Sequence, residues 1–277
     1  MSASDAAAEP RTVPPPASHY GAAAQLGIDV GGTSIKGAIV DLRTGQLAGP
    51  IHSAQTPGTA TPEHVATRVR QIAAAEHWTG SVGIALPGVI VGSCLHHAPN
   101  LSSAWEREGA LDRLRMPGDG DVVLINDADA AGLAELTYGP SGSSDNGLTV
   151  VLTFGTGIGS ALIHDGDLIA NSELGGLVVG AGRFEDVASG RAISDDELTP
   201  AQWAERAQPF FDQLEAMLNP GRWVLGGGFS EKFEQYSSRL KLTKPVDVAH
   251  LGEHAGIVGA AAAVKWARES GTQSDQR

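Results

Sequence analysis

Short apolar runs separated by glycine-rich turns give the sequence its pattern. Residues 26–30 form an apolar run typical of a buried strand, residues 31–34 a turn of Gly, Thr and Ser, and residues 35–42 an alternating strand that turns into a third. The same order of strand, Gly/Thr turn, strand and polar turn returns in residues 149–166. Two such units ~120 residues apart predict two similar lobes, because solenoid repeats recur at far shorter periods.

Helical and strand-like segments alternate along the rest of the chain. The predicted elements are helices at residues 61–77, 128–136 and 255–268 and strands at residues 81–86, 121–125 and 223–225. The first helix has Thr61 as a candidate N-cap and Pro62 at its first position, where proline is tolerated. This alternation predicts an α/β fold.

Composition narrows the class of protein. The 277 residues carry a formal net charge of −13, and Lys and Arg are nowhere concentrated, so neither nucleic acid nor a membrane surface is an expected partner. Residues 1–24 form an Ala/Pro-rich segment that we expect to be a disordered tail, with three prolines where a signal peptide needs an apolar stretch. Cys94 is the single cysteine, which excludes an intramolecular disulfide and a Cys-based zinc site. A cytoplasmic location is expected.

Three glycine clusters, each at the end of a predicted strand, are candidate phosphate-binding turns. Glycine leaves backbone N–H groups open to an anion. One such cluster alone would be an ordinary hairpin turn, but three favour a ligand. A Walker A loop or a Rossmann fingerprint is excluded, because a strand and not a helix follows the first cluster. The expected phosphate-donor residues are Gly31, Gly32, Thr33, Ser34, Lys36, Gly155, Thr156, Gly157, Gly227 and Gly228.

Several motifs together resemble the ROK family of sugar kinases and, within it, the actinobacterial polyphosphate glucokinases. The motifs lie at residues 27–37, 85–89, 126–132, 153–162, 173–175, 226–228 and 255–261. The resemblance implies an actin-like ATPase (ribonuclease H-like) fold of two lobes. Its small N-terminal lobe would hold residues 25–128 and 255–277, and its large C-terminal lobe residues 129–254. It also implies Mg²⁺, ATP or polyphosphate as phosphoryl donor, a sugar-like acceptor and a homodimer. Zinc is not expected, because the clustered cysteines that bind it in other family members are missing.

The resemblance assigns roles to particular residues. Asp127 is the expected general base for a sugar hydroxyl, the 6-hydroxyl of a hexose, although an Asp there would also serve as a helix cap. Asp29 is expected to face Mg²⁺, directly or through water, and is otherwise a turn-forming residue. Asp129 is expected to be a simple first-turn helix charge. The expected sugar-binding residues are Asn100, Asn126, Glu173 and Glu185.

One position departs from the family pattern. The family motif is Glu-Leu-Gly-His, and in this sequence Gly176 occupies the position of its histidine. No nearby histidine stands in register, since His164 and His250 belong to other segments. The missing imidazole would weaken sugar binding and would open volume for a larger acceptor. We therefore expect an acceptor other than plain glucose, or glucose bound weakly. The alternative is a catalytically weak or inactive sugar-binding protein of the same family. A DNA-binding repressor is disfavoured, because only ~25 residues precede the first glycine turn.

Overall fold

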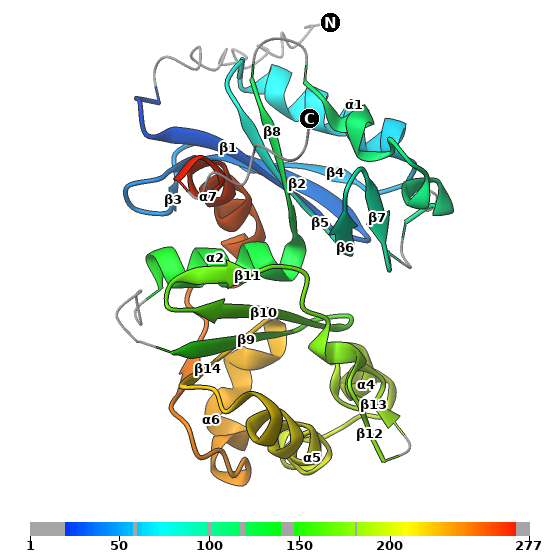
Figure 1. Ribbon diagram of the computed structural model, residues 1–277, viewed down its shortest axis with the longest axis vertical. Helices are drawn as coiled ribbons and strands as arrows, with labels where there is room; N and C mark the ends of the chain where they lie inside the picture. The colour runs from blue at the N-terminus through cyan, green and yellow to red at the C-terminus, as the bar shows by residue number, and fades with distance from the viewer. Residues whose placement is uncertain are drawn as a thin grey trace, which may run out of the picture.

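The computed structural model describes residues 20–57, 60–98, 101–116, 120–139, 147–180 and 182–269. It contains two mixed sheets, each with helices beside it, stacked along the long axis of the molecule (Figure 1). We call the first sheet and α1 the N-terminal lobe, and the second sheet with α3 to α6 the C-terminal lobe. Most of the predicted tail, Asn100 and residues 270–277 lie outside the described residues.

The N-terminal lobe contains a six-stranded sheet in the order β3-β2-β1-β5-β8, with β4 also paired to β2. β1 is antiparallel to β2 and parallel to β5, which is parallel to β8. Thr61 caps α1 and Pro62 begins it, as predicted. The strands are β1 (Ala24–Val30), β2 (Ser34–Asp41), β3 (Gln46–Leu47), β4 (His52–Gln55), β5 (Val82–Leu86) and β8 (Val122–Asn126); a separate hairpin holds β6 (Val89–Val91) and β7 (Cys94–His96), and the helices are α1 (Pro62–Ala75), η2 (Ser103–Glu106) and η3 (Leu111–Leu114).

The C-terminal lobe repeats this arrangement. Its five-stranded sheet has the order β11-β10-β9-β14-β15, with the same pattern of antiparallel and parallel pairs. The predicted echo of residues 26–42 in residues 149–166 is therefore confirmed as β1–β2–β3 and β9–β10–β11. The strands are β9 (Leu148–Phe154), β10 (Ile158–His164), β11 (Asp167–Ile169), β14 (Arg222–Gly226) and β15 (Val246–Val248), with a small pair β12 (Val178–Val179) and β13 (Gly182–Arg183); the helices are η4 (Leu174–Gly176), α3 (Phe184–Ala188), α4 (Gly190–Asp195), α5 (Pro200–Leu218), η5 (Gly228–Lys232), α6 (Phe233–Tyr236) and η6 (Ser237–Arg239).

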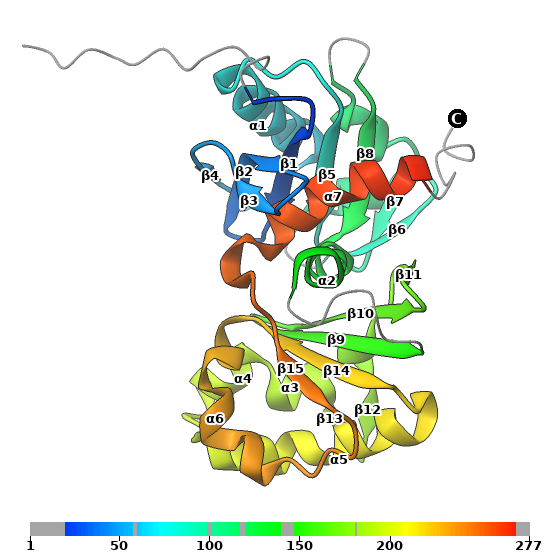
Figure 2. The ribbon, with the colours of Figure 1, turned by 90° about the vertical axis from the view of Figure 1, so that its left-hand side faces the viewer.

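Two helices lie between the sheets and pack against each other: α2 (Asp127–Tyr138) and α7 (Ala255–Glu269), the latter after the short η7 (Gly252–His254) (Figure 2). α7 packs on β1, β5 and β8 of the N-terminal lobe, as predicted. Small residues permit these contacts, since a Cβ on Gly259 would lie 1.7 Å from the carbonyl oxygen of Ala130. The predicted lobe boundary after residue 128 falls inside α2, which touches both sheets, so that division of the chain stays a prediction.

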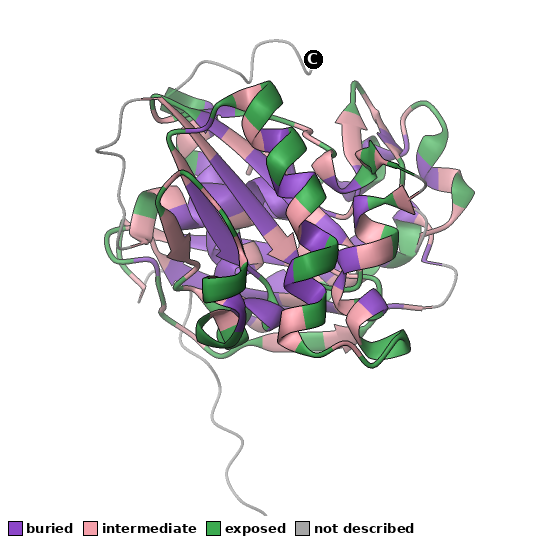
Figure 3. Cartoon of the chain, turned by 90° about the horizontal axis from the view of Figure 1, so that it is seen from below, coloured by how far each residue is buried: buried purple, intermediate pink, exposed green. Residues whose placement is uncertain are grey.

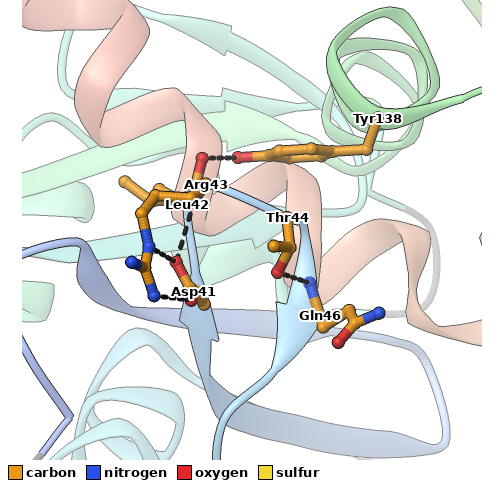
Figure 4. Close-up of polar contacts among 6 residues, drawn as sticks. All are labelled: Asp41, Leu42, Arg43, Thr44, Gln46 and Tyr138. Atoms are coloured by element: carbon orange, nitrogen blue, oxygen red, sulfur yellow. Dashed lines mark hydrogen bonds and ion pairs between the residues drawn. The ribbon is translucent and has the colours of Figure 1, made fainter.

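The far end of α2 is fixed to the turn between β2 and β3 (Figure 4). The Tyr138 hydroxyl donates to the carbonyl oxygen of Leu42 over 3.0 Å. The turn between these strands brings Gly45, at φ +71°, against the Tyr138 ring. Any larger residue at position 45 would displace the ring, so this glycine sets how closely α2 approaches the sheet.

The central strands of both sheets are largely buried, edge strands such as β4 are partly exposed, and the outer faces of the surrounding helices are exposed (Figure 3). Aliphatic side chains such as Ile28 and Ile84 dominate the core of the N-terminal lobe. Aromatic side chains dominate the other core, where Trp203 meets the edge of Phe154 with ring centroids 5.1 Å apart. Among the described residues no helix has both the length and the apolar composition needed to cross a bilayer.

Candidate active site

Asp127 stands where β8 ends and α2 begins. Asn126, and not Asp127, is the N-cap of α2: its Oδ1 accepts from the backbone N–H of Ala128 at 2.8 Å and of Asp129 at 3.0 Å. Its Nδ2 donates to the carbonyl oxygen of Gly88 at 3.0 Å. Capping therefore does not require Asp127, although its Oδ1 also accepts from the Ala128 N–H at 2.9 Å. Asp127 lines a cavity between the two sheets.

We call this cavity, of about 550 Å³, the donor cavity, after the predicted phosphate-donor residues in its lining. Residues from the glycine turns of both lobes line it. Its lining includes the predicted residues Asp29, Gly32, Thr33, Asn126, Asp127, Gly155, Thr156, Gly157, Glu173, Glu185 and Gly227. The other predicted donor residues are not in that lining. Gly31 closes its turn by donating to the Ser34 carbonyl oxygen at 2.9 Å, and Lys36 pairs with Glu253 at 3.2 Å. Gly228 lines a neighbouring cavity.

Burial and neighbouring acidic groups raise the pKa of the Asp127 carboxyl. Burial raises the pKa of Asp127 to about 7, and the nearby carboxylates of Asp29 and Glu173 add to the rise. The backbone N–H of Ala128 opposes it. Burial also raises the pKa of Asp29, against the pull of Lys36. A carboxyl that titrates near neutral pH inside a cleft is suited to exchanging protons with a ligand.

The same carboxylates test whether a divalent cation fits. Among the residues described, no group of three or more His, Cys, Asp or Glu side chains has the geometry to hold a metal by itself. Asp29 is half-buried against Gly256, where a Cβ would lie 2.8 Å from the Asp29 carboxyl carbon. The Asp29 carboxylate is close enough to Asp127 to raise the pKa of Asp127. A cation held by one carboxylate and by donor phosphate oxygens fits this charge, which is the usual way Mg²⁺ is bound.

An acceptor cavity of about 700 Å³ adjoins the donor cavity, and His97, Glu173 and Glu185 line both. Burial raises the pKa of Glu173, with His97 opposing and Glu185 adding to the rise. Glu185 pairs with Arg183 at 3.2 Å. Trp105 forms a fully buried wall and donates from Nε1 to the Ala60 carbonyl oxygen at 2.8 Å. The predicted sugar residues Glu173 and Glu185 thus share one cavity; Asn100 lies outside the described residues.

The open position in this cavity is Gly176. A Cβ built there would meet no atom within 4 Å, so a side chain at this position would extend into free space. The sequence predicts added volume here because the family histidine is missing; the effect of that volume on the choice of acceptor stays a prediction.

Two residues of the cavity linings were not identified from the sequence, and the burial of a third residue was not predicted. His97 follows β7 and faces Glu173 from the other lobe, and Arg191 of α4 lines the donor cavity beside Gly155. Asp129 is the third: it lies in the first turn of α2, as expected, but it is buried and not a simple helix charge. No local signal marks any of them, because each acquires its place through contacts with distant segments.

Asp129 takes part in a contact between the lobes. Its Oδ2 accepts from the backbone N–H of Asn171 at 2.7 Å, and burial raises its pKa to about 7. The Asn171 side chain accepts from the N–H of Ile90 at 3.0 Å and donates to the Ile90 carbonyl oxygen at 3.1 Å. We call Asp129, Asn171 and Ile90 the lobe clamp.

Comparison with known proteins identifies the family of this chain and its fold. The model of the ROK family matches residues 25–177. A polyphosphate glucokinase of Mycobacterium tuberculosis (strain ATCC 25618 / H37Rv) is 42% identical over 239 residues, covering 86% of this chain and 90% of that protein. The polyphosphate glucokinase of Mycobacterium leprae is 38% identical over 267 residues, covering 95% and 82%. The crystal structure of an inorganic polyphosphate/ATP-glucomannokinase from Arthrobacter superposes with a TM-score of 0.79 at 39% identity, covering 89% of this chain and 99% of that one. The predicted actin-like α/β fold is confirmed.

Proposed function

This chain belongs to the ROK family, and from that premise we propose that it is a sugar kinase that moves a phosphoryl group from inorganic polyphosphate or ATP to a hexose or hexose-like acceptor. The acceptor atom is the 6-hydroxyl oxygen, and Asp127 is the general base. The supporting observation is the position of Asp127, with a pKa near 7, in a cavity that the glycine turns of both lobes line.

The donor lies between the two turns. The backbone N–H groups of Gly32 and Gly157 and the hydroxyls of Thr33 and Thr156 are suited to phosphate oxygens. Asp29 would hold Mg²⁺, directly or through water, and that ion would neutralise charge on the transferred group. Arg191 adds a positive charge at the same turn. A phosphoryl transfer needs little more than this alignment and charge neutralisation.

The acceptor lies toward Glu173 and Glu185. Its 6-oxygen attacks the terminal phosphorus of the donor, and the bond from that phosphorus to the bridging oxygen breaks. The proton of the 6-hydroxyl goes to the Asp127 carboxylate, and the shortened polyphosphate or ADP leaves with the bridging oxygen. The base must be ionised, so kcat/KM rises with pH through an apparent pKa near 7.

The free space at Gly176 concerns which acceptor is used. We propose that it admits a substituent that a side chain at this position would exclude. Amino or N-acylated hexoses should then be used at least as well as glucose.

An activity matrix tests the proposal. Polyphosphate and ATP are each combined with glucose, mannose, amino sugars and inositols, with ³¹P NMR to locate the phosphate on the product. Asp127→Asn should lower kcat by at least about 1,000-fold while sugar binding persists in calorimetry. Turnover that survives this substitution would contradict Asp127 as the base. Wild-type protein that binds sugar without turnover would support the inactive sugar-binding alternative.

A further inference from the structure

We propose that His97 contacts the acceptor sugar and determines which hexose is accepted, reaching it from the lobe opposite Glu173. The inference deepens the proposed function and rests on it. It assigns a hydrogen-bond donor to the acceptor cavity, in which the predicted sugar-binding residues are carboxylates.

The position of His97 comes from the β6–β7 hairpin. This hairpin pairs Val89 with His96 and Val91 with Cys94, and His97 follows directly at φ +54°. That conformation is uncommon for a residue with a side chain, although histidine is among those enriched in it. It directs the chain so that His97 is exposed and lines both the donor and the acceptor cavity. Its ring is near enough to Glu173 to lower the pKa of that carboxyl.

In the acceptor cavity an imidazole adds a hydrogen-bond donor to those of the Ser102 and Ser103 hydroxyls. Sugar hydroxyls both donate and accept hydrogen bonds. The ionised carboxylates of Glu106, Glu173 and Glu185 can accept hydrogen bonds but cannot donate them. The Arg183 guanidinium is engaged by Asp186 at 2.8 Å and 2.9 Å. Within the described part of the chain, no hydrogen bond engages the His97 ring. A neutral imidazole offers one donor and one acceptor, which complements the carboxylates.

The lobe clamp holds this histidine across from its partner. Asn171 binds both backbone polar groups of Ile90, in the first strand of the hairpin that carries His97. Two residues after Asn171 the chain reaches Glu173. The same clamp therefore sets the hairpin and the Glu173 segment side by side, so His97 and Glu173 flank the space that Gly176 leaves open.

Replacing the ring tests the inference. His97→Gly removes the imidazole and suits a positive φ, and His97→Asn keeps a hydrogen-bonding side chain in a residue that also tolerates it. We expect His97→Gly to raise the acceptor KM and the calorimetric Kd by about tenfold, with kcat and the donor KM changed by less than about threefold. His97→Asn should lose less affinity. His96→Ala is the matched control, because His96 lies on the same hairpin but lines neither cavity, and it should leave the acceptor KM unchanged.

A second arm asks which hydroxyl the ring binds. The preference for glucose over its 1-, 2- and 3-deoxy analogues is measured in wild type and in His97→Gly. If the ring binds one hydroxyl, the preference against one analogue falls in the variant while the others persist. Adding Gly176→His to His97→Gly should restore affinity, since the space at position 176 accepts a side chain.

The outcomes separate the two levels of the argument. An unchanged acceptor KM in His97→Gly, with a large rise in Glu173→Gln, overturns the role of His97 and leaves the kinase intact. A uniform loss of preference against all analogues also overturns it, because that indicates a general distortion. A wild-type protein that neither binds nor phosphorylates any hexose overturns the proposed function together with this inference.

Discussion

The two lobes share a strand order and differ in what they present to the cleft. Each begins with an antiparallel pair joined by a glycine turn, which Gly31 closes by donating to Ser34 at 2.9 Å and Gly155 by donating to Gly157 at 3.0 Å. Two residues before each turn stands a side chain that lines the donor cavity: Asp29 in one lobe and Thr153 in the other. The same hairpin thus supplies a charge on one side and a neutral hydroxyl on the other. Repetition of a fold element provides two phosphate-sized turns, and a single residue gives each its chemistry.

The helices that follow β8 and β15, the last strands in the two sheet orders, make the lobes dependent on each other. α2 follows β8 of the N-terminal lobe but packs on β10 of the C-terminal lobe, whereas α7 follows β15 and packs on β1, β5 and β8. Each lobe therefore completes its burial with a helix that the other lobe's chain delivers. The cleft floor is built from this crossing, which explains why small residues are concentrated in α7.

Among the contrasts between the two lobes, the difference between the two turns predicts the largest effect on activity. Asp29→Asn removes the charge that faces the donor, and we expect kcat/KM to fall by about 100-fold and the Mg²⁺ requirement to rise. Thr153→Val keeps the shape of the side chain and removes only a hydroxyl, so its loss should stay below about tenfold. Steady-state kinetics across a Mg²⁺ titration measures both. Equal losses in the two variants would contradict a larger catalytic contribution from the Asp29 charge than from the Thr153 hydroxyl.

The crossing of the helices predicts a large effect on stability. Gly259→Ala would place a Cβ 1.7 Å from the Ala130 carbonyl oxygen, where α7 meets α2, so backbone must move. We expect the free energy of unfolding to fall by about 2–4 kcal/mol, measured by urea denaturation. Gly176→Ala is the control, because its Cβ meets no atom within 4 Å, and its effect should stay below about 0.5 kcal/mol. An unaffected Gly259→Ala variant would mean that the helices separate readily.

The residues that follow β8 and β15 differ in charge, and this difference predicts how the stability of the protein depends on pH. β8 runs into Asp127, whereas β15 is followed by the uncharged Ala249 in the same cavity. The pKa of Asp127 is raised in the folded chain to about 7 from an ordinary 3.8, so the folded state binds this proton more tightly than the unfolded state. Stability is therefore lost as pH rises from about 4 to about 7.

Asp127→Asn removes that loss. Its Tm should match wild type near pH 4 and exceed it by about 3 °C or more at pH 8. Thermal unfolding followed by circular dichroism measures the difference. Asp195→Asn, at an exposed position of α4, should show no such trend. A constant Tm difference across pH would contradict a raised pKa at Asp127.

The lobe clamp predicts the smallest effect. Asn171 has φ +63°, so Asn171→Gly keeps the backbone conformation and removes both side-chain hydrogen bonds to Ile90. We expect the acceptor KM to rise about threefold to tenfold with little change in the donor KM. Opposite behaviour, with the donor KM alone rising, would show that the clamp serves the other cavity.

Much of the fold was predictable because its signals are local. Strand periodicity, the glycine turns and the cap of α1 at Thr61 depend on neighbouring residues, and their bounds hold to within about two residues. Which of Asn126 and Asp127 caps α2 was not predictable, because either side chain can cap a helix. In the structure Asn126 is the cap, and it also donates to the carbonyl oxygen of Gly88, 38 residues away in the chain. His97 was missed for a similar reason: its partner Glu173 lies in the other lobe.

The sequence by itself determined the repeated strand–turn units, the residue types that suit phosphate and sugar, and the absence of a side chain at position 176. Only the tertiary structure decided which polar groups meet across the cleft. Asn171 and Ile90 are 81 residues apart in the chain, and their contact depends on how two lobes fold around crossed helices. Local preferences act over a few residues, whereas burial, pKa shifts and pairing across a cavity arise from the whole packed chain.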